Sequence, residues 1–116
     1  MDIKLIRWVG SSHRDLKTMP HPVRRVFGYG LYLAQIGRRD HRTKTLSGFG
    51  SASVAEMSER DADGTYRVVY TARFANAVYV LHCFQKKSKT GIATPKAEMD
   101  LVRARLREAE AHAKGK

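Results

Sequence analysis

Two neighbouring segments with alternating apolar residues constrain the fold of this chain more than any other feature. Thr65–Arg73 is rich in β-branched and aromatic residues, and Ala77–Gln85 is the most apolar segment of the sequence. Only Ala75 and Asn76 mark a connection between them, and such short connections join antiparallel strands. The pattern therefore predicts a β-hairpin at the centre of the fold.

Two further strands are predicted beside this hairpin. Ser53–Glu59 alternates in polarity and ends before a strong turn signal at Asp63 and Gly64, so the three consecutive strands form an antiparallel meander. Ile3–Val9 carries apolar residues of both parities, which indicates a first strand covered on both sides.

Three helices are expected from apolar residues spaced three and four apart. They are Ser12–Thr18, Pro22–Ile36 and Pro95–Ala113. Ser12 and Thr94 are the expected N-caps. Gly28 and Gly30 in the second helix suggest a close approach to another backbone, and Gly37–Ala52 is predicted to be a basic loop.

The predicted class is α+β, with a small antiparallel sheet, an N-terminal helical pair and a C-terminal helix in the order β-α-α-β-β-β-α. Residues 1–116 are long enough for one domain with a single core. Cys83 is the only cysteine, which excludes an internal disulfide and fits a reducing, cytoplasmic setting. No export signal or membrane-spanning segment is recognisable.

The charge balance points to a polyanionic partner. Lysine and arginine number 22 against 11 aspartate and glutamate residues, for a net charge of +11. Net charge reports on association and not on chemistry. Nucleic acid is therefore the first candidate partner, and a merely basic soluble protein is the alternative.

The hairpin brings ionisable side chains to the start of a basic segment. In the first strand of the hairpin, Thr65–Arg73, Arg67 and Arg73 share one side, and Tyr70 lies on the other. In the second strand His82 shares its side with three apolar residues, Val78, Val80 and Phe84. The segment that follows is cationic or carries hydroxyl groups: Lys86, Lys87, Lys89 and Thr90.

These residue types suit the cleavage of RNA without a metal or other cofactor. That reaction needs a base for the 2′-hydroxyl, cations for the charge that builds on the phosphate, and an acid for the departing 5′-oxygen. Arg67 and Arg73 are candidate phosphate clamps, and Lys86 and Lys87 are candidate charge stabilisers or bases. We expect Arg67→Ala to abolish activity with little loss of folding if Arg67 belongs to the site.

Two further candidates have equally simple structural interpretations. His82 could act as acid or base, but a histidine between apolar residues is often a core residue. Tyr70 could supply a proton if it faces the groove, but it could also pack within the sheet.

A second basic surface lies in the predicted loop. Its cations are Arg38, Arg39, Arg42 and Lys44, which are opposed there only by Asp40. Such a charge run is commonly a solvated face, but with Lys89 and Thr90 it could also bracket an RNA backbone. No nucleotide-binding loop, zinc-spaced ligand set or serine nucleophile motif is present, and a metal site is not expected.

At these positions the sequence resembles the RelE and HigB toxins of type II toxin–antitoxin systems, in their phage-derived HigB-like branch. The matching residues are Leu46, Gly48, Gly50, Glu56, Tyr66–Tyr70, Val80–His82, Phe84–Thr90, Thr94, Pro95, Glu98 and the helical segment Arg103–Arg107. The tryptophan that often precedes the glutamate of this family is replaced by Val54 and Ala55.

The resemblance implies a toxin that enters the ribosome and cuts mRNA through its 2′-hydroxyl. It also implies silencing by a HigA-like antitoxin with a helix-turn-helix domain. By the same resemblance, Arg67 matches the phosphate-binding strand arginine, and Lys86 and Lys87 match the basic edge. A ParE-like gyrase poison and a non-catalytic basic RNA-binding protein are the alternatives.

Overall fold

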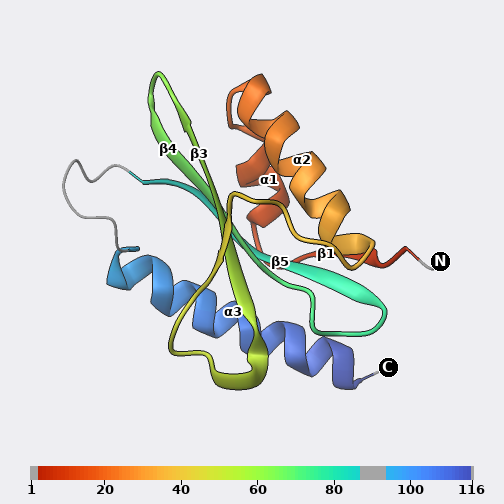
Figure 1. Cartoon of the computed structure of the whole chain (residues 1–116). Coiled ribbons are helices and arrows are strands. Elements are labelled where there is room, and N and C mark those ends of the chain that lie inside the picture. Colours follow the sequence, from red (N-terminus) through yellow and green to blue (C-terminus); the bar gives the residue numbers. More distant parts are fainter. Residues whose placement is uncertain (1–2, 87–93, 116) are drawn as a thin grey trace.

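A computed structural model describes residues 3–86 and 94–115 of the chain, and Figure 1 shows a sheet between two layers of helices. The strands are β1 (Leu5–Trp8), β2 (Thr43–Thr45), β3 (Val54–Asp61), β4 (Gly64–Thr71) and β5 (Ala77–Lys86). The helices are α1 (Ser12–Lys17), α2 (His21–Gln35) and α3 (Lys96–Lys114), with a short 3-10 turn at Gly50–Ala52. The predicted α+β class and the order of its main elements are confirmed.

The strands lie in the order β1-β5-β4-β3-β2. β3, β4 and β5 form the predicted antiparallel meander, and β1 pairs with β5 in parallel. β1 is an edge strand, and the expectation that it is covered on both sides is wrong at its start, because Ile3 and Leu5 are each 57% exposed.

The predicted loop Gly37–Ala52 contains the other edge strand. β2 pairs antiparallel with β3, where Lys44 lies opposite Glu56. Three residues are too few to show a period-two pattern, so only the pairing with β3 identifies this strand. As a result, Lys44 has a fixed place in the sheet.

Each face of the sheet has its own core. The core beneath α1 and α2 includes Leu16, Val23, Phe27, Met57, Val68 and Val80, and the core beneath α3 includes Val54, Val69, Leu81, Val102 and Leu106. The predicted apolar stripe of the last helix is thus confirmed at its buried positions. Within the described part of the chain, no helix has the length and apolarity needed to cross a membrane.

A β-bulge in β5 changes the direction of the side chains that follow it. Val69 pairs with His82 whereas Tyr70 pairs with Val80, so Leu81 is an extra residue in β5. His82 therefore shares the α3 face with Phe84, while Val80 packs beneath α1 and α2. The prediction that His82 shares the side of Val80 is wrong for this reason.

Both predicted N-cap residues make other contacts. α1 is preceded by Ser11, whose hydroxyl donates to the Asp15 carboxylate at 2.7 Å, whereas the Ser12 hydroxyl donates to the Val80 carbonyl at 3.2 Å. Thr94 precedes the N-cap of α3 and donates to Glu56 at 2.8 Å. The Ser12 and Thr94 hydroxyl groups therefore connect the starts of α1 and α3 to strands β5 and β3.

Gly30 is expected to be intolerant of any side chain, whereas Gly28 is not. A Cβ atom at Gly30 would overlap the Sδ atom of the fully buried Met57, which is a side chain and not the expected backbone, and nothing lies within 4 Å of one at Gly28. Gly30→Ala should lower the free energy of unfolding by about 1–3 kcal/mol through overpacking. Gly28→Ala should raise it by up to about 1 kcal/mol. Urea denaturation of both variants measures these changes, and equal effects would contradict the predicted contact at Gly30.

The thiol of Cys83 should be unreactive in the folded protein. It is 2% exposed, and burial raises its pKa to about 12, with a smaller contribution from Asp15. Since the thiolate is the reactive form, a thiol reagent at about pH 8 should label Cys83 only after unfolding. Rapid labelling of the native protein would show that this part of β5 opens locally.

Candidate active site

A buried carboxylate, Glu56, lies at the centre of a polar cluster between the sheet and the start of α3. Its Oε1 atom accepts a hydrogen bond from Arg67 Nη1 at 2.5 Å and lies 3.7 Å from Lys44 Nζ. Its Oε2 atom accepts the hydrogen bond from the Thr94 hydroxyl. Glu56 is fully buried and Arg67 is 7% exposed, so this is a desolvated ion pair.

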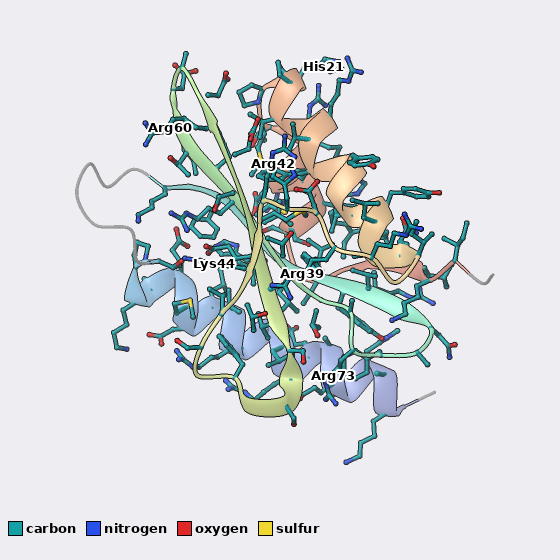
Figure 2. The ribbon with its side chains drawn as sticks, in the orientation of Figure 1. His21, Arg39, Arg42, Lys44, Arg60 and Arg73 are labelled. Atoms are coloured by element: carbon teal, nitrogen blue, oxygen red, sulfur yellow. The ribbon has the colours of Figure 1, made fainter. Side chains whose placement is uncertain are left out.

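Four neighbouring strands supply the charged members of this cluster. Lys44 of β2 lies opposite Glu56 of β3, and Arg67 of β4 lies opposite Ser58, two residues further along β3. Lys86 of β5 lies opposite Thr65, so it shares the face of Arg67. The sheet register therefore places Lys44, Glu56, Arg67 and Lys86 on the side that α3 covers, where Figure 2 labels Lys44.

The cluster is positively charged overall, because three cations surround one carboxylate. Burial lowers the pKa of Lys86 below its ordinary value; the positive charges of Arg67 and Lys44 lower it further, and Glu56 opposes them. Lys86 is 7% exposed, whereas more than half of the Lys44 side chain is exposed. A polyanion would therefore meet Lys44 first.

His82 lies on the same face and links β5 to α3. Its Nε2 atom lies 2.7 Å from Oε1 of Glu98, and its Nδ1 atom lies 3.4 Å from Nη1 of Arg105. A guanidinium can only donate, so this geometry favours the tautomer in which Nε2–H donates to Glu98. The imidazole ring also stacks on Phe84, with 4.6 Å between the ring centroids.

The matching family model covers residues 14–107 and describes a phage-derived Gp49-like protein. This chain belongs to the Gp49-like family. Among solved structures, a mutant of the E. coli toxin RelE in the free state has a TM-score of 0.59 at 15% identity, covering 94% of this chain and 98% of that one. The chain therefore has the RelE fold, and the resemblance to RelE-like toxins inferred from its motifs is confirmed.

A further similar structure is the RelBE2 toxin–antitoxin complex from Mycobacterium tuberculosis. It shows 20% identity and a TM-score of 0.47, and the similarity covers 76% of this chain and 97% of that one. Comparison with curated protein sequences finds no significant match.

The Gp49-like fold brings only some of the predicted site residues together. Arg67, Lys86, Lys44 and His82 share the α3 face, as described above. Tyr70 projects to the opposite face, where it is 3% exposed and belongs to the core beneath α1 and α2. Burial raises the pKa of Tyr70, which makes it a poorer acid at this position. The predicted catalytic group containing both Arg67 and Tyr70 is therefore not formed.

Arg73 is also separate from the cluster. It follows Arg67 by six residues, which corresponds to about 20 Å in an extended chain. Its guanidinium donates to Glu110 of α3 at 3.1 Å and lies 4.5 Å from the centre of the Phe74 ring. The expected pair of phosphate clamps on β4 is thus divided between two places.

The predicted RNA-binding residues also divide. Arg38 and Arg39 lie beside Tyr70 around a cavity on the other face of the sheet. Arg42 forms ion pairs with Asp40 at 3.2 Å and with Glu59 at 3.1 Å. The other predicted RNA-binding residues, Lys89 and Thr90, and Lys87 of the predicted catalytic group lie outside the described residues.

Sequence reasoning missed the polar contacts that hold α3 on the cluster. Glu98 contacts His82, and Arg105 donates to the Leu81 carbonyl at 3.0 Å and to the Ser11 hydroxyl at 3.1 Å. The signal for Glu56 was present, because Glu56 shares its parity with the buried Val54. No local pattern indicates the partners of Glu98 or Arg105.

Within residues 3–86 and 94–115, no three histidine, cysteine or carboxylate side chains are grouped so that they could hold a metal ion. The candidate site, as described, therefore offers cations, one carboxylate, a hydroxyl and a histidine–carboxylate pair. This set can stabilise negative charge and move protons.

Proposed function

We propose that this Gp49-like protein is the toxin of a toxin–antitoxin system and cleaves mRNA on the ribosome without a metal. The observation that carries the proposal is the cationic cluster, in which Arg67 is fixed by Glu56 and the pKa of Lys86 is lowered. The RelE fold and the family match support the assignment to toxins.

The proposed reaction is an attack of the RNA 2′-oxygen on the adjacent phosphorus. The P–O5′ bond breaks, and a 2′,3′-cyclic phosphate and a free 5′-hydroxyl are formed. Lys86 in its neutral form would take the 2′-hydroxyl proton, and a water molecule would give a proton to the departing 5′-oxygen. Arg67 and Lys44 would stabilise the charge on the phosphate oxygens. His82 and Glu98 would hold α3 against the sheet beside the reacting phosphate.

The proposed protein partner is a HigA-like antitoxin with a helix-turn-helix domain, and the proposed location is the cytoplasm. An acidic segment of the antitoxin could cover the basic surface, because complementary potentials speed association and neutralise the site. A neighbouring reading frame that encodes a helix-turn-helix protein would support this partner. Its purification as a stable complex with the chain would test the interaction directly.

Mapping of mRNA ends in a translating extract tests the proposed activity. The purified chain should produce new 5′ ends within ribosome-bound messages and none in the same mRNA without ribosomes. Intact mRNA with unimpaired translation would contradict the proposal. Blocked DNA supercoiling without cleavage would support a gyrase poison, and RNA binding without either effect would support a non-catalytic protein.

Lys44 provides a substitution that should change activity more than folding. Its exposed ammonium lies 3.7 Å from Glu56, and exposed ion pairs typically contribute at most about 1 kcal/mol. Lys44→Gln should lower kcat/KM for mRNA cleavage about tenfold or more, since a charge beside the reacting phosphate is lost. Arg60→Gln, which removes an exposed charge from β3 outside the cluster, is the matched control. Equal rates for the two variants would exclude Lys44 from the site.

A further inference from the structure

A cavity lined by basic residues lies on the opposite side of the sheet from the cluster around Glu56. It has a volume of about 460 Å³ and lies between the end of α2 and the ends of β3 and β4. Its basic lining residues are Lys4, Arg38, Arg39 and Arg73, of which Arg73 is paired with Glu110 of α3, and Tyr70 and Ser53 also line it. None of the described residues that line the cavity is acidic.

These cations are partly held in place by the surrounding structure. Lys4 Nζ donates to the Ala72 carbonyl at 2.6 Å, and Arg39 Nη2 donates to the Thr45 hydroxyl at 2.9 Å. The Arg73 guanidinium instead contacts Glu110 of α3 and the Phe74 ring, so its charge is already opposed on the α3 side of the sheet. The contacts of Lys4 and Arg39 each use only one of several N–H donors on the cation, which leaves donors suited to the oxygens of a phosphate.

The convergence of separate segments distinguishes this cavity from an ordinary charged helix end. Arg38 and Arg39 follow α2, where cations complement the negative end of the helix dipole. That effect does not account for Lys4, which precedes β1 and comes to the cavity from another part of the chain. The left-handed backbone at Gly37, with a φ of 80°, reverses the chain and places Arg38 and Arg39 at the cavity.

The edge strand β2 connects the cavity with the candidate active site. Lys44 contacts Glu56 on the α3 face, whereas Thr45 receives the hydrogen bond of Arg39, a cavity residue. Figure 2 shows Lys44 and Arg39 on either side of this edge, with Arg73 beyond them. Adjacent residues of β2 therefore contact the two sites, Lys44 the cluster around Glu56 and Thr45 the cavity residue Arg39.

We propose that this cavity binds a phosphate group of the same RNA strand, several nucleotides away from the phosphate that is cut. This inference rests on the proposed function. The six residues from Arg67 to Arg73, which lines the cavity, span about 20 Å of extended chain. This distance corresponds to about six nucleotides of a stacked RNA strand, and to fewer in an extended one. Arg38, Arg39 and Lys4 contact the distant phosphate, while Lys44 and Arg67 contact the reacting one.

Binding of uncleavable RNA of two lengths tests the proposal. The probes are 2′-O-methyl oligonucleotides of about four and about ten nucleotides, and inorganic pyrophosphate serves as a small phosphate ligand. Arg38→Gln combined with Arg39→Gln removes two exposed cavity charges, and Arg14→Gln combined with Arg25→Gln removes two exposed charges from α1 and α2. Circular dichroism checks that both double variants are folded.

The cavity variant should bind the longer oligonucleotide at least about tenfold more weakly, and its salt-dependence slope should fall by about 1.4. The control variant should keep both values, and the shorter oligonucleotide should bind both variants equally. Equal losses in the two variants would show a general charge effect and overturn the proposal. Losses of pyrophosphate and of both oligonucleotides from the cavity variant would show a small-phosphate site and overturn the assignment to an RNA strand.

These measurements distinguish a failure of the cavity proposal from a failure of the proposed mRNA cleavage. If the selective loss of the longer oligonucleotide is seen but the chain cuts no mRNA, the cavity is supported as an RNA-binding site and the proposed function fails. If the chain cuts mRNA and the cavity variant binds both oligonucleotides normally, the proposed function is supported and the cavity is excluded.

Discussion

Arg67→Ala should lower the free energy of unfolding by about 3–5 kcal/mol, because it leaves the fully buried Glu56 carboxylate without its closest cation. This result would replace the simpler expectation that Arg67→Ala affects activity with little loss of folding. Lys44 is too exposed to compensate, and the Thr94 hydroxyl supplies a hydrogen bond but no charge. Urea denaturation monitored by circular dichroism measures the change.

The double variant Arg67→Met/Glu56→Leu distinguishes the contribution of the ion pair to stability from that of the packing around it. Removing both charges avoids an uncompensated carboxylate, so the double variant should regain most of the lost stability. It should also be inactive, because the phosphate-stabilising cation is absent. If Arg67→Ala alone unfolds like the unmodified protein, the Glu56–Arg67 ion pair contributes little to stability.

The parts of the fold that follow from local sequence patterns were predicted well. β4 and β5 are long enough for their alternation to be read, and α3 shows its apolar stripe at Val102, Leu106 and Ala109. The bulge at Leu81 was not predictable, because the alternation of β5 continues in the sequence while its pairing with β4 shifts. Because of this extra residue, His82 faces α3.

The candidate site was predicted only where its residues lie on adjacent strands. Arg67 and Lys86 are close because the register of β4 and β5 brings them together. Tyr70 and Arg73 were grouped with them in error, because one strand presents two faces and extends beyond a single site. The contact of Glu98 with His82 depends on how α3 crosses the sheet, which no local pattern determines.

Lys86→Arg should reduce the rate of mRNA cleavage by a factor of about 10²–10⁴, the usual contribution of a positioned acid or base. The lysine can act as a base because burial, Arg67 and Lys44 lower its pKa, which increases its neutral fraction near neutral pH. Arginine keeps the positive charge but does not lose its proton. The variant should therefore bind an uncleavable RNA normally but cut slowly.

The pH dependence of the unmodified protein provides an independent check on Lys86. A base must be deprotonated, so cleavage should increase with pH and level off above the pKa of Lys86, which lies below the ordinary lysine value. Lys96→Arg, an exposed substitution on α3, is the matched control and should leave the pH profile unchanged. If Lys86→Arg cuts at the normal rate while Lys86→Gln does not, Lys86 supplies charge only and another group must accept the 2′-hydroxyl proton.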